Sequence, residues 1–459
     1  MKCLINLVIC SLCINLTLSV KDTYRAAVVV DPPKTVDLGR YVSFIQDAAK
    51  SKADILVLPS PEKPNYGEEY YDEAVKTLSE AAKENKIYVV AHLYEETRCH
   101  GESEVVRNNL VFDRRGAVIV VYRKPLNKRA NCTTSPSEII EFTTDFGVTF
   151  GLMMEEDLVL KKPRSLKNYI VAGEWRSEIP FLSASQFSSS WAYVTNANLV
   201  FSGGIYAGKA GLKSGSGKMS VVELHKNCDS GETIAPVVPP TKSYPSEDAL
   251  HLYAVKAVNV EVSLRGYTET VCHDELCCEF YIKSDFIGST PSEVSYGLAA
   301  FNGARHFGVH YHIGAQSCAV FAYKPGGITG SESNSTNLHF EKITVTGNFS
   351  GPNKSQFPII LSSAKNDILS TKFKFETSQM SQKMTIEASD GDILSFGIFG
   401  RDFSKDFESE NIRQVNSEGL TWDVYEYLYN EDVQEFFDYV WIRLRIMLVI
   451  VSIYILEMM

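Results

Sequence analysis

The sequence has no excess of basic residues. It contains 45 Lys and Arg against 56 Asp and Glu, a formal net charge of −11, and no sustained basic patch. Binding to nucleic acid depends on Lys and Arg that neutralise phosphates, so a nucleic-acid partner is not expected. Apolar residues make up 44% of the 459 residues, which is enough for the cores of two or three domains.

The sequence also lacks an apolar run that could span a membrane as a helix, which takes about 20 residues. Shorter apolar stretches lie at both ends. Residues 1–20 combine Lys2 with a largely apolar Leu4–Leu18, which is typical of a signal peptide. Ile446–Leu456 has the length of the hydrophobic tail of a lipid-anchor signal, although a small-residue cleavage site is poorly placed. A membrane-associated tail and a plain amphipathic end are the alternatives.

Secretion would place the chain where disulfides form and sequons are glycosylated. The cysteines outside the signal peptide are odd in number, which leaves one thiol over and the pairing open; they are Cys99, Cys132, Cys228, Cys272, Cys277, Cys278 and Cys318. The glycosylation sequons begin at Asn131, Asn334, Asn348 and Asn353. These features predict a disulfide-bonded glycoprotein that is secreted or held at the extracellular face of the plasma membrane.

Motifs for phosphates and metals are missing as well. Gly208–Lys218 is rich in Gly and Ser, but Met219 stands where a phosphate-binding loop has Ser or Thr. His306, His310 and His312 would share one face of a strand, yet no acidic or Cys partner stands at the spacing of a metal motif. We expect no metal and no cofactor, and the oligomeric state is open.

In the first half, short apolar runs that predict buried strands alternate with amphipathic helical patterns. Strands are expected at Tyr24–Val30, Asp54–Pro59, Ile87–Leu93 and Tyr169–Gly173, and helices at Val36–Lys50, Glu68–Asn85 and Pro180–Ala197. Asn109–Asp113 and Ala117–Tyr122 flank a turn at Arg114-Arg115-Gly116, which predicts a β-hairpin. The fold class is therefore α/β, with a mixed sheet.

The character of the chain changes after about residue 265. Strand-like runs there are separated by turns rich in Gly, Asn and Ser; they are Cys278–Ile282, His310–Ile313, Ala319–Tyr323, Ile343–Thr346 and Met384–Ile386. This pattern predicts a separate β-rich domain. The expected divisions are a signal peptide (1–20), an α/β domain (21–265), a β-rich domain (266–405) and an acidic segment with an apolar tail (406–459).

The segment Asp145–Leu160 poses a puzzle. Apolar runs around Gly147 and Gly151 predict a buried strand with a bend. Glu155, Glu156 and Asp157 then stand where the apolar run should continue. Three carboxylates beside a core strand are costly unless they reach water or meet a cation. The segment is therefore either a solvated strand end or a site at the mouth of a sheet.

Several motifs together resemble the carbon–nitrogen hydrolase (nitrilase) superfamily. In the first half these are Ala53–Pro59, Asn108–Asp113 and Val121–Lys124. Within this superfamily, the sequence is most similar to the vanin/biotinidase branch. Three features favour that branch: the double cysteine of Val271–Cys278, the segments Pro180–Phe187 and Ser190–Ala192 with Asn198-Leu199, and the segment Phe396–Arg401. The resemblance covers residues 24 to 402.

The resemblance implies an α-β-β-α sandwich followed by a β-rich C-terminal domain. It also implies an enzyme that cleaves amides such as pantetheine or biotin conjugates with a Glu–Lys–Cys triad. In that chemistry a carboxylate takes the proton of the thiol, the thiolate attacks the amide carbon, and the lysine stabilises the oxyanion.

Only one member of that triad matches. Lys124 stands at the position of the family lysine; without the resemblance it would be taken as a surface lysine at a hairpin end. Ser60 stands where the family has its glutamate, and Glu155 where it has its cysteine. The family's cysteine begins a motif of Cys, an aromatic residue, Asp and an aliphatic residue, whose place is taken here by Glu155–Leu158. Asp157 matches the Asp of that motif, which anchors this alignment.

Substitutes for the two missing groups are few. A two-residue shift would let Glu62 act as the base. Gly147–Leu160 contains no Cys or Ser, Thr149 lies too early, and Cys132 and Cys228 lie away from the motif. A carboxylate nucleophile would form an anhydride that readily reverts.

Two functions remain open. One is a vanin-like secreted glycoprotein that has lost amide hydrolysis, in which Glu155 forms an ion pair with Lys124 in the old pocket. The other is an amidohydrolase that acts on a small linear amide, pantetheine- or biotin-amide-like, with Glu62 or water-based chemistry. Whether the chain is an enzyme is thus uncertain, and a sequence error near residues 152–156 is a third explanation.

Overall fold

The computed structural model describes residues 21–408 apart from short gaps at 31–35, 61–66, 127–132, 134–135, 174–176, 215–217, 229–245, 248–249, 287–293, 309–310, 325–326, 329–337, 350, 363–372, 379–380 and 388–392. Several sequence predictions lie outside these residues: the signal peptide, the tail after residue 408, Glu62, Asn131, Cys132, His310 and Asn334. Within the described part, no helix is long and apolar enough to cross a membrane.

The first domain contains two mixed sheets. The first runs in the order β12 (Ser220–His225), β1 (Thr23–Val28), β2 (Ile55–Val57), β3 (Tyr88–Cys99), β4 (Glu102–Phe112) and β5 (Val118–Pro125). The second runs β11 (Gly204–Ala207), β10 (Asn198–Phe201), β8 (Asn168–Val171), β7 (Thr149–Met153) and β6 (Ile140–Thr143). Parallel strands form the centre of each sheet and antiparallel strands its edges, as the mixed-sheet prediction requires.

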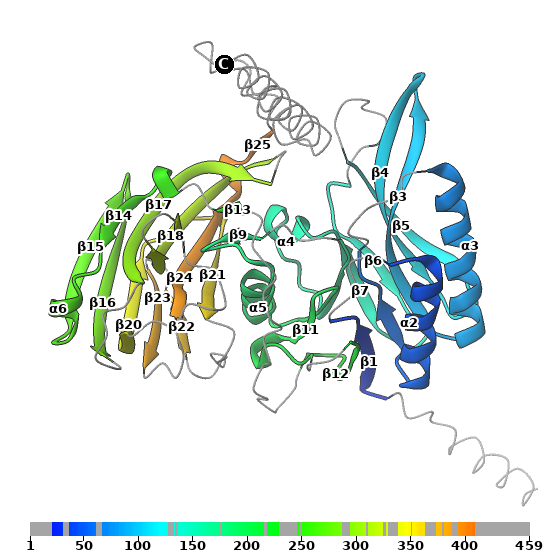
Figure 1. Cartoon of the computed structure of the whole chain (residues 1–459), viewed down its shortest axis with the longest axis horizontal. Helices are drawn as coiled ribbons and strands as arrows, with labels where there is room; N and C mark the ends of the chain where they lie inside the picture. Colours follow the sequence, from blue (N-terminus) through cyan, green and yellow to red (C-terminus); the bar gives the residue numbers. More distant parts are fainter. Residues whose placement is uncertain are drawn as a thin grey trace, which may run out of the picture. The chain divides into compact units, whose positions relative to one another are not determined.

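Two helices cover the outer face of the first sheet, and a third packs on the second (Figure 1). α2 (Leu38–Lys50) and α3 (Glu68–Asn85) share one apolar cluster with the outward side chains of β1 to β4. A second cluster fills the space between the two sheets. α5 (Ala184–Thr195) begins at the capping box of Ser183 and Gln186, four residues later than predicted, and contacts β10 and β11. The layers are thus α-β-β-α.

β3 and β4 form a hairpin that the sequence did not predict, and both strands extend beyond the predicted runs Ile87–Leu93 and Asn109–Asp113. Its far half is polar, so an apolar pattern could not reveal it, but its pairing continues to Cys99 and Glu102. His100 and Gly101 form the two-residue turn, both with positive φ, which suits the twist of a hairpin. The predicted hairpin is confirmed: β4 and β5 are joined by a turn at Gly116, whose φ is +80°.

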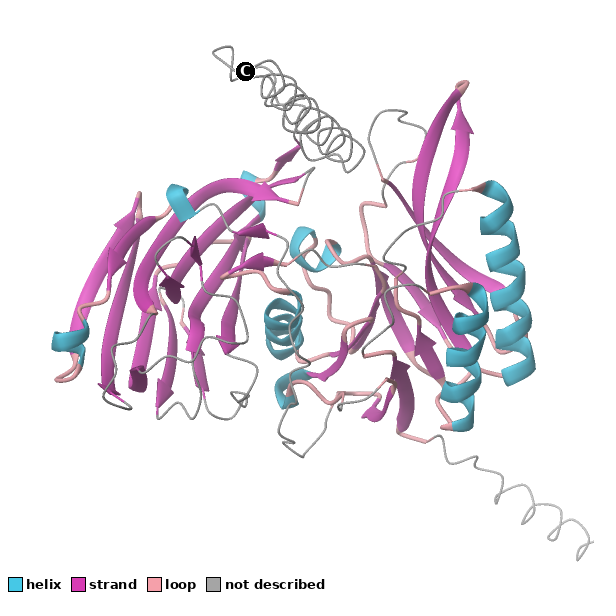
Figure 2. Ribbon diagram, in the orientation of Figure 1, coloured by secondary structure: helices cyan, strands magenta, loops and turns pink. Residues whose placement is uncertain are grey.

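The second domain is built almost entirely of strands (Figure 2). One sheet runs β14 (Ala254–Ala257), β17 (Ser295–Phe307), β18 (Tyr311–Lys324), β24 (Ile393–Asp402) and β21 (Lys354–Ser362). The other runs β15 (Tyr267–His273), β16 (Leu276–Phe286), β20 (Leu338–Gly347), β23 (Gln382–Glu387) and β22 (Phe373–Thr377). β14 belongs to this domain although it precedes residue 266, because it pairs with β17. The described residues 304–308, 311–314 and 404–408 belong to a separate compact unit.

Two disulfides hold the strands of this domain. Cys272–Cys277 closes the turn between β15 and β16. Cys278–Cys318 joins β16 of one sheet to β18 of the other. Cys228 is buried and is in neither bridge. β18 includes two runs that the sequence predicts as separate strands, because the small residues between them pair with β24.

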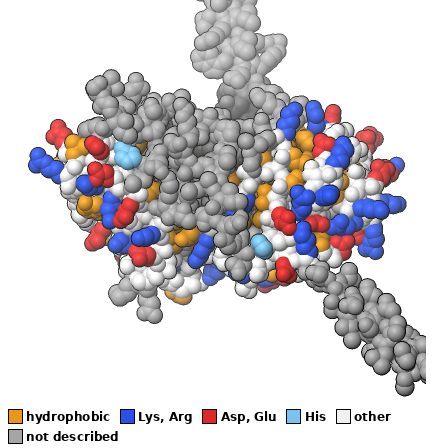
Figure 3. Space-filling view, turned by 90° about the horizontal axis from the view of Figure 1, so that it is seen from below, with side chains coloured by type: hydrophobic (Ala, Val, Ile, Leu, Met, Phe, Trp, Pro, Cys, Tyr) orange, Lys and Arg blue, Asp and Glu red, His pale blue; other side chains and the backbone are white. Residues whose placement is uncertain are grey.

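Two surface features bear on the predictions about glycosylation and charge, although neither feature tests them. Asn348 and Asn353, which begin two sequons, are exposed. On the face drawn in Figure 3, acidic and basic side chains are interspersed.

Candidate functional site

The three carboxylates of the puzzling segment are buried. β7 ends at Met153 and the chain turns into α4 (Asp157–Leu160), with Glu155 and Glu156 in the turn. Glu155 is 9% exposed, Glu156 6% and Asp157 0%. The interpretation as a solvated strand end is therefore wrong, since these side chains lie inside the domain and meet cations there.

Asp157 organises this turn. Its Oδ2 accepts hydrogen bonds from the backbone N–H of Met154 at 2.9 Å and from the Tyr122 hydroxyl at 2.6 Å. Its Oδ1 accepts from Lys124 Nζ at 2.6 Å, and Lys161 Nζ lies 3.6 Å away. Both oxygens of this buried carboxylate are therefore hydrogen-bonded.

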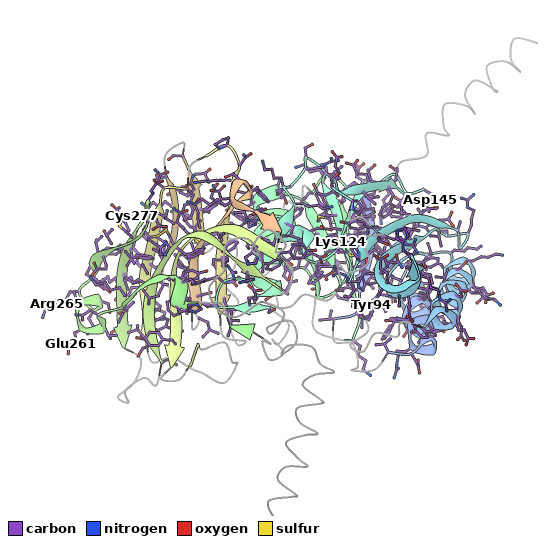
Figure 4. The ribbon with its side chains drawn as sticks, turned by 90° about the horizontal axis from the view of Figure 1, so that it is seen from above. Tyr94, Lys124, Asp145, Glu261, Arg265 and Cys277 are labelled. Atoms are coloured by element: carbon purple, nitrogen blue, oxygen red, sulfur yellow. A yellow bond between two sulfur atoms is a disulfide. The ribbon has the colours of Figure 1, made fainter. Side chains whose placement is uncertain are left out.

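Two cations face the carboxylates from neighbouring strands. Arg107 on β4 and Lys124 on β5 stand opposite each other in the antiparallel register, so their side chains share the inner face of the sheet. Lys124 (labelled in Figure 4) is 2% exposed, and its Nζ also donates to Glu156 Oε1 at 3.0 Å. It is therefore a buried lysine and not a surface one.

Arg107 is the residue that sequence reasoning missed. Its Nη1 donates to Glu155 Oε1 at 2.9 Å and to Glu156 Oε2 at 3.3 Å, and its Nη2 donates to Glu156 Oε1 at 2.7 Å. It lies in the polar half of β4, beyond the strand that the apolar pattern predicts. Extending the β4–β5 register to Lys124 would have revealed it.

The predicted ion pair between Glu155 and Lys124 is corrected. Lys124 contacts Glu156 and Asp157, and Glu155 contacts Arg107. The physical reason is the space over Gly173, which has no Cβ. The Glu155 side chain occupies that space and meets the guanidinium of Arg107 there.

The pKa values of the two glutamates are shifted in opposite directions. Burial, reinforced by the charge of Glu156, raises the pKa of Glu155 well above its usual value. Burial also acts to raise the pKa of Glu156, but Lys124 and Arg107 outweigh it and hold that pKa well below the usual value. Glu155 is thus the more readily protonated of the two glutamates, and Glu156 carries the charge that Lys124 and Arg107 stabilise.

His92 adds a neutral base to the same layer. Asn109 Nδ2 donates to the carbonyls of Met153 and Ala172, both at 2.9 Å, so its Oδ1 must accept from His92 Nδ1 at 2.6 Å. This fixes the proton of His92 on Nδ1. Burial lowers the pKa of His92 to about 4, which keeps the ring neutral. Its Nε2 is buried and has no hydrogen-bond partner within the described ranges.

Ser60 follows β2 at the edge of the sheet where β3 carries His92. Its Oγ is buried and meets no hydrogen-bonding group among the residues described. A serine hydroxyl cannot take up a proton near neutral pH, so no base is present at this position. The roles of Ser60, Glu155 and Lys124 as counterparts of the family triad remain predictions.

Among the described side chains, no group of three His, Cys, Asp or Glu is placed to hold a metal ion. A cavity of about 490 Å³ lies on the opposite face of the first sheet, between α3 and β4–β5, and is lined by Tyr71, Val75, Leu110, Val118 and Val121 among others. It contains none of the carboxylates.

Comparisons with known proteins agree with this geometry. A family model for carbon-nitrogen hydrolases matches residues 25–153, and a model for the Vanin C-terminal domain matches residues 246–406. The chain belongs to the vanin branch of the carbon–nitrogen hydrolase (nitrilase) superfamily. The nitrilase-like sandwich with its β-rich C-terminal domain is thereby confirmed.

Its vanin-type relatives are distant in sequence. The chain is 26% identical to Vanin-like protein 1 of Drosophila melanogaster, over 83% of this chain and 86% of that protein. It is 25% identical to the pantetheinase of Homo sapiens, over 79% of this chain and 75% of that protein. A solved structure of an amidase double mutant from Nesterenkonia sp. AN1, in complex with acrylamide, shares 18% identity and a TM-score of 0.33 over 44% of this chain and 91% of that one.

The Vanin C-terminal domain contacts the carboxylate turn directly. Arg401 on β24 is fully buried, and its Nε donates to the carbonyl of Val159 in α4 at 2.8 Å. The last carbonyls of a helix lack partners within the helix, and a cation there is favourable. The C-terminal domain thus stabilises the short helix that begins with Asp157.

Proposed function

We propose that this chain is an extracellular vanin-type protein that does not hydrolyse amides through a cysteine. The observation that supports this most directly is the buried pairing of Lys124 with Glu156 and Asp157. A lysine that is neutralised by two carboxylates is poorly suited to stabilise an oxyanion.

The chemistry at the other two positions supports the same proposal. Glu155 stands at the family's cysteine position. Its carboxyl group can exchange protons, but its attack on an amide would form an anhydride that readily reverts. Ser60 offers no base. An extracellular location is supported by the two disulfides and by the signal-like residues 1–20.

The test is release of cysteamine from pantetheine by the purified full chain. The repair variant combines Ser60→Glu and Glu155→Cys, and a second form adds Glu156→Phe, since Glu156 would still neutralise Lys124 and the family has an aromatic residue there. The matched control is Ser60→Glu with Glu155→Ala, which restores the base without a thiol.

We expect no turnover by the wild type or the control, and turnover by a repair variant. Lys124→Met in the active repair variant should abolish that turnover. Cysteamine release by the wild type would show that the chain is an active amidohydrolase and would overturn the proposal.

A further inference from the structure

The outer edge of β5 has no partner strand. β5 is the last strand of the first sheet, and within the described part of the chain no strand pairs with its outer edge. The backbone N–H of Leu126 donates to the carbonyl of Val105 on β4 at 2.9 Å. Hydrogen-bonded residues alternate along an antiparallel pair, so Val121 and Arg123 direct their backbone N–H and C=O groups away from β4. These groups are placed to pair with a further strand.

The exposed side chains along this edge are apolar. Val118 and Ile119 are each 38% exposed, and Val121 is 43% exposed. The pairing with β4 slips by one residue between Val118 and Val120, and this bulge turns both Val118 and Val121 onto the outer face of the sheet. The charged residues and prolines that commonly protect an exposed edge are absent from residues 117–122.

This edge continues into the cavity of about 490 Å³ between α3 and β4–β5. Val118 and Val121 line the cavity together with Leu110 of β4 and with Tyr71 and Val75 of α3. An unpaired backbone edge and an apolar hollow thus form one continuous strip. A contiguous exposed apolar surface of this kind is typical of an interaction site.

We propose that β5 pairs antiparallel with β5 of a second copy of this chain. A two-fold axis beside Val120 brings Val121 of one copy against Ile119 of the partner subunit, and the reverse, so that apolar side chains meet apolar side chains. Arg123 then lies opposite Ala117 of the partner subunit, so no two like charges face each other across the new pair. The two first sheets become one continuous sheet, and neither keeps this edge open.

The charges beside the cavity suit the same symmetry. α3 runs along β5 from Tyr71 to Ser79, whose Oγ donates to the carbonyl of Gly116, just before β5, at 2.6 Å. The two-fold axis reverses this direction in the second copy. Asp72 of one copy therefore stands on the side of Lys76 of the partner subunit, with opposite charges across the joined cavities. This complementarity favours a second copy over an unrelated strand as the occupant.

The experiment is sedimentation velocity of the purified full chain over about two decades of concentration around the micromolar range. We expect a reversible equilibrium between monomer and dimer. Val121→Lys places a charge in the middle of the apolar contact and should weaken dimerisation at least about tenfold. Val194→Lys is the matched control, because Val194 is 39% exposed on α5, away from this edge. Its dimerisation should equal that of the wild type.

A measurement on the wild type covers the case in which the β5 variant does not fold. Hydrogen exchange followed by mass spectrometry should slow at the backbone amides of Val121 and Arg123 as the protein concentration rises. Amides of β2, which already has a partner strand on each side, should not respond. A chain that stays monomeric, a dimer that Val121→Lys leaves intact, or exchange in β5 that does not depend on concentration would overturn the proposal.

Discussion

Glu155 lies so close over Gly173 that a Cβ built on the glycine would be 1.6 Å from Glu155 Oε2. The glycine also has φ = +143°, which side chains other than glycine rarely adopt. Gly173→Ala should therefore destabilise the protein by about 3 kcal/mol or more, from overpacking and backbone strain together.

The clash part of that loss is specific to Glu155. In the Glu155→Ala background, Gly173→Ala should cost at least about 1 kcal/mol less, which a double-mutant cycle by urea unfolding would measure. Additive effects of the two substitutions would contradict the contact. The strain at φ = +143° remains in both backgrounds, so only part of the loss should be recovered.

The two buried glutamates should respond oppositely to loss of charge. Glu156 is ionised between two cations, so Glu156→Gln leaves these partly unpaired and should cost about 3–5 kcal/mol at pH 7. The raised pKa of Glu155 means that its charge is disfavoured in the folded protein, so Glu155→Gln should be as stable as the wild type or more so.

The pH dependence follows from the two pKa shifts. The raised pKa of Glu155 makes wild-type stability fall as pH rises above the unfolded pKa of about 4.3, since only the unfolded chain ionises. The advantage of Glu155→Gln should therefore grow as pH rises from about 4.3 toward the raised folded pKa of Glu155. The lowered pKa of Glu156 gives stability that is present above about pH 4.3 and lost as pH falls through its folded pKa. Urea unfolding across this range measures both, and equal losses for the two variants would refute the assignment.

Asp113 should be essential for the turn between β4 and β5. Its Oδ1 accepts the backbone N–H groups of Arg115 at 2.8 Å and Ala117 at 2.9 Å. Asp113→Ala should cost about 1–3 kcal/mol, because these donors lose their partner. Asp145→Ala is the matched control: that exposed carboxylate contacts Arg114 at 3.2 Å, and its loss should cost less than about 1 kcal/mol.

Acid should remove the contribution of Asp113. Burial acts to raise its pKa, but the hydrogen bonds from Arg115 and Ala117 outweigh burial and lower the pKa of Asp113. Its stabilisation is thus present above the unfolded pKa of about 3.9 and lost as pH falls through the lower folded pKa. The gap between wild type and Asp113→Asn, followed by thermal unfolding, should close below that range. A gap that stays constant would argue against an ionised cap.

The two disulfides should contribute different amounts to the free energy of unfolding. Cys278–Cys318 closes a sequence separation of 40 residues and Cys272–Cys277 one of 5. Loop-closure entropy gives about 4 kcal/mol for the first and about 2 kcal/mol for the second. Replacing each pair by Ala and comparing urea midpoints tests this order. A larger loss from the short bridge would contradict it.

Local pattern determined much of this protein. The buried strands of the first domain, α2, α3, the hairpin at Gly116 and the β-rich second half follow from apolar period and turn residues, which act over a few neighbouring positions. Family motifs supplied the sandwich and the substituted positions at Ser60 and Glu155. Polar strand segments, such as the far half of β3 and β4, escaped this reasoning because nothing in their local pattern marks them as paired.

The partners of the buried charges were decided by the tertiary structure alone. Sequence placed Lys124 near three carboxylates, but the choice of Glu156 and Asp157 depends on the β4–β5 register, which brings Arg107 beside it, and on the space over Gly173, which accepts Glu155. The same holds for Arg401, which reaches α4 from a strand more than 200 residues away in sequence. Charge pairing in a low-dielectric interior depends on distances of a few ångströms between distant segments, and a linear pattern does not contain those distances.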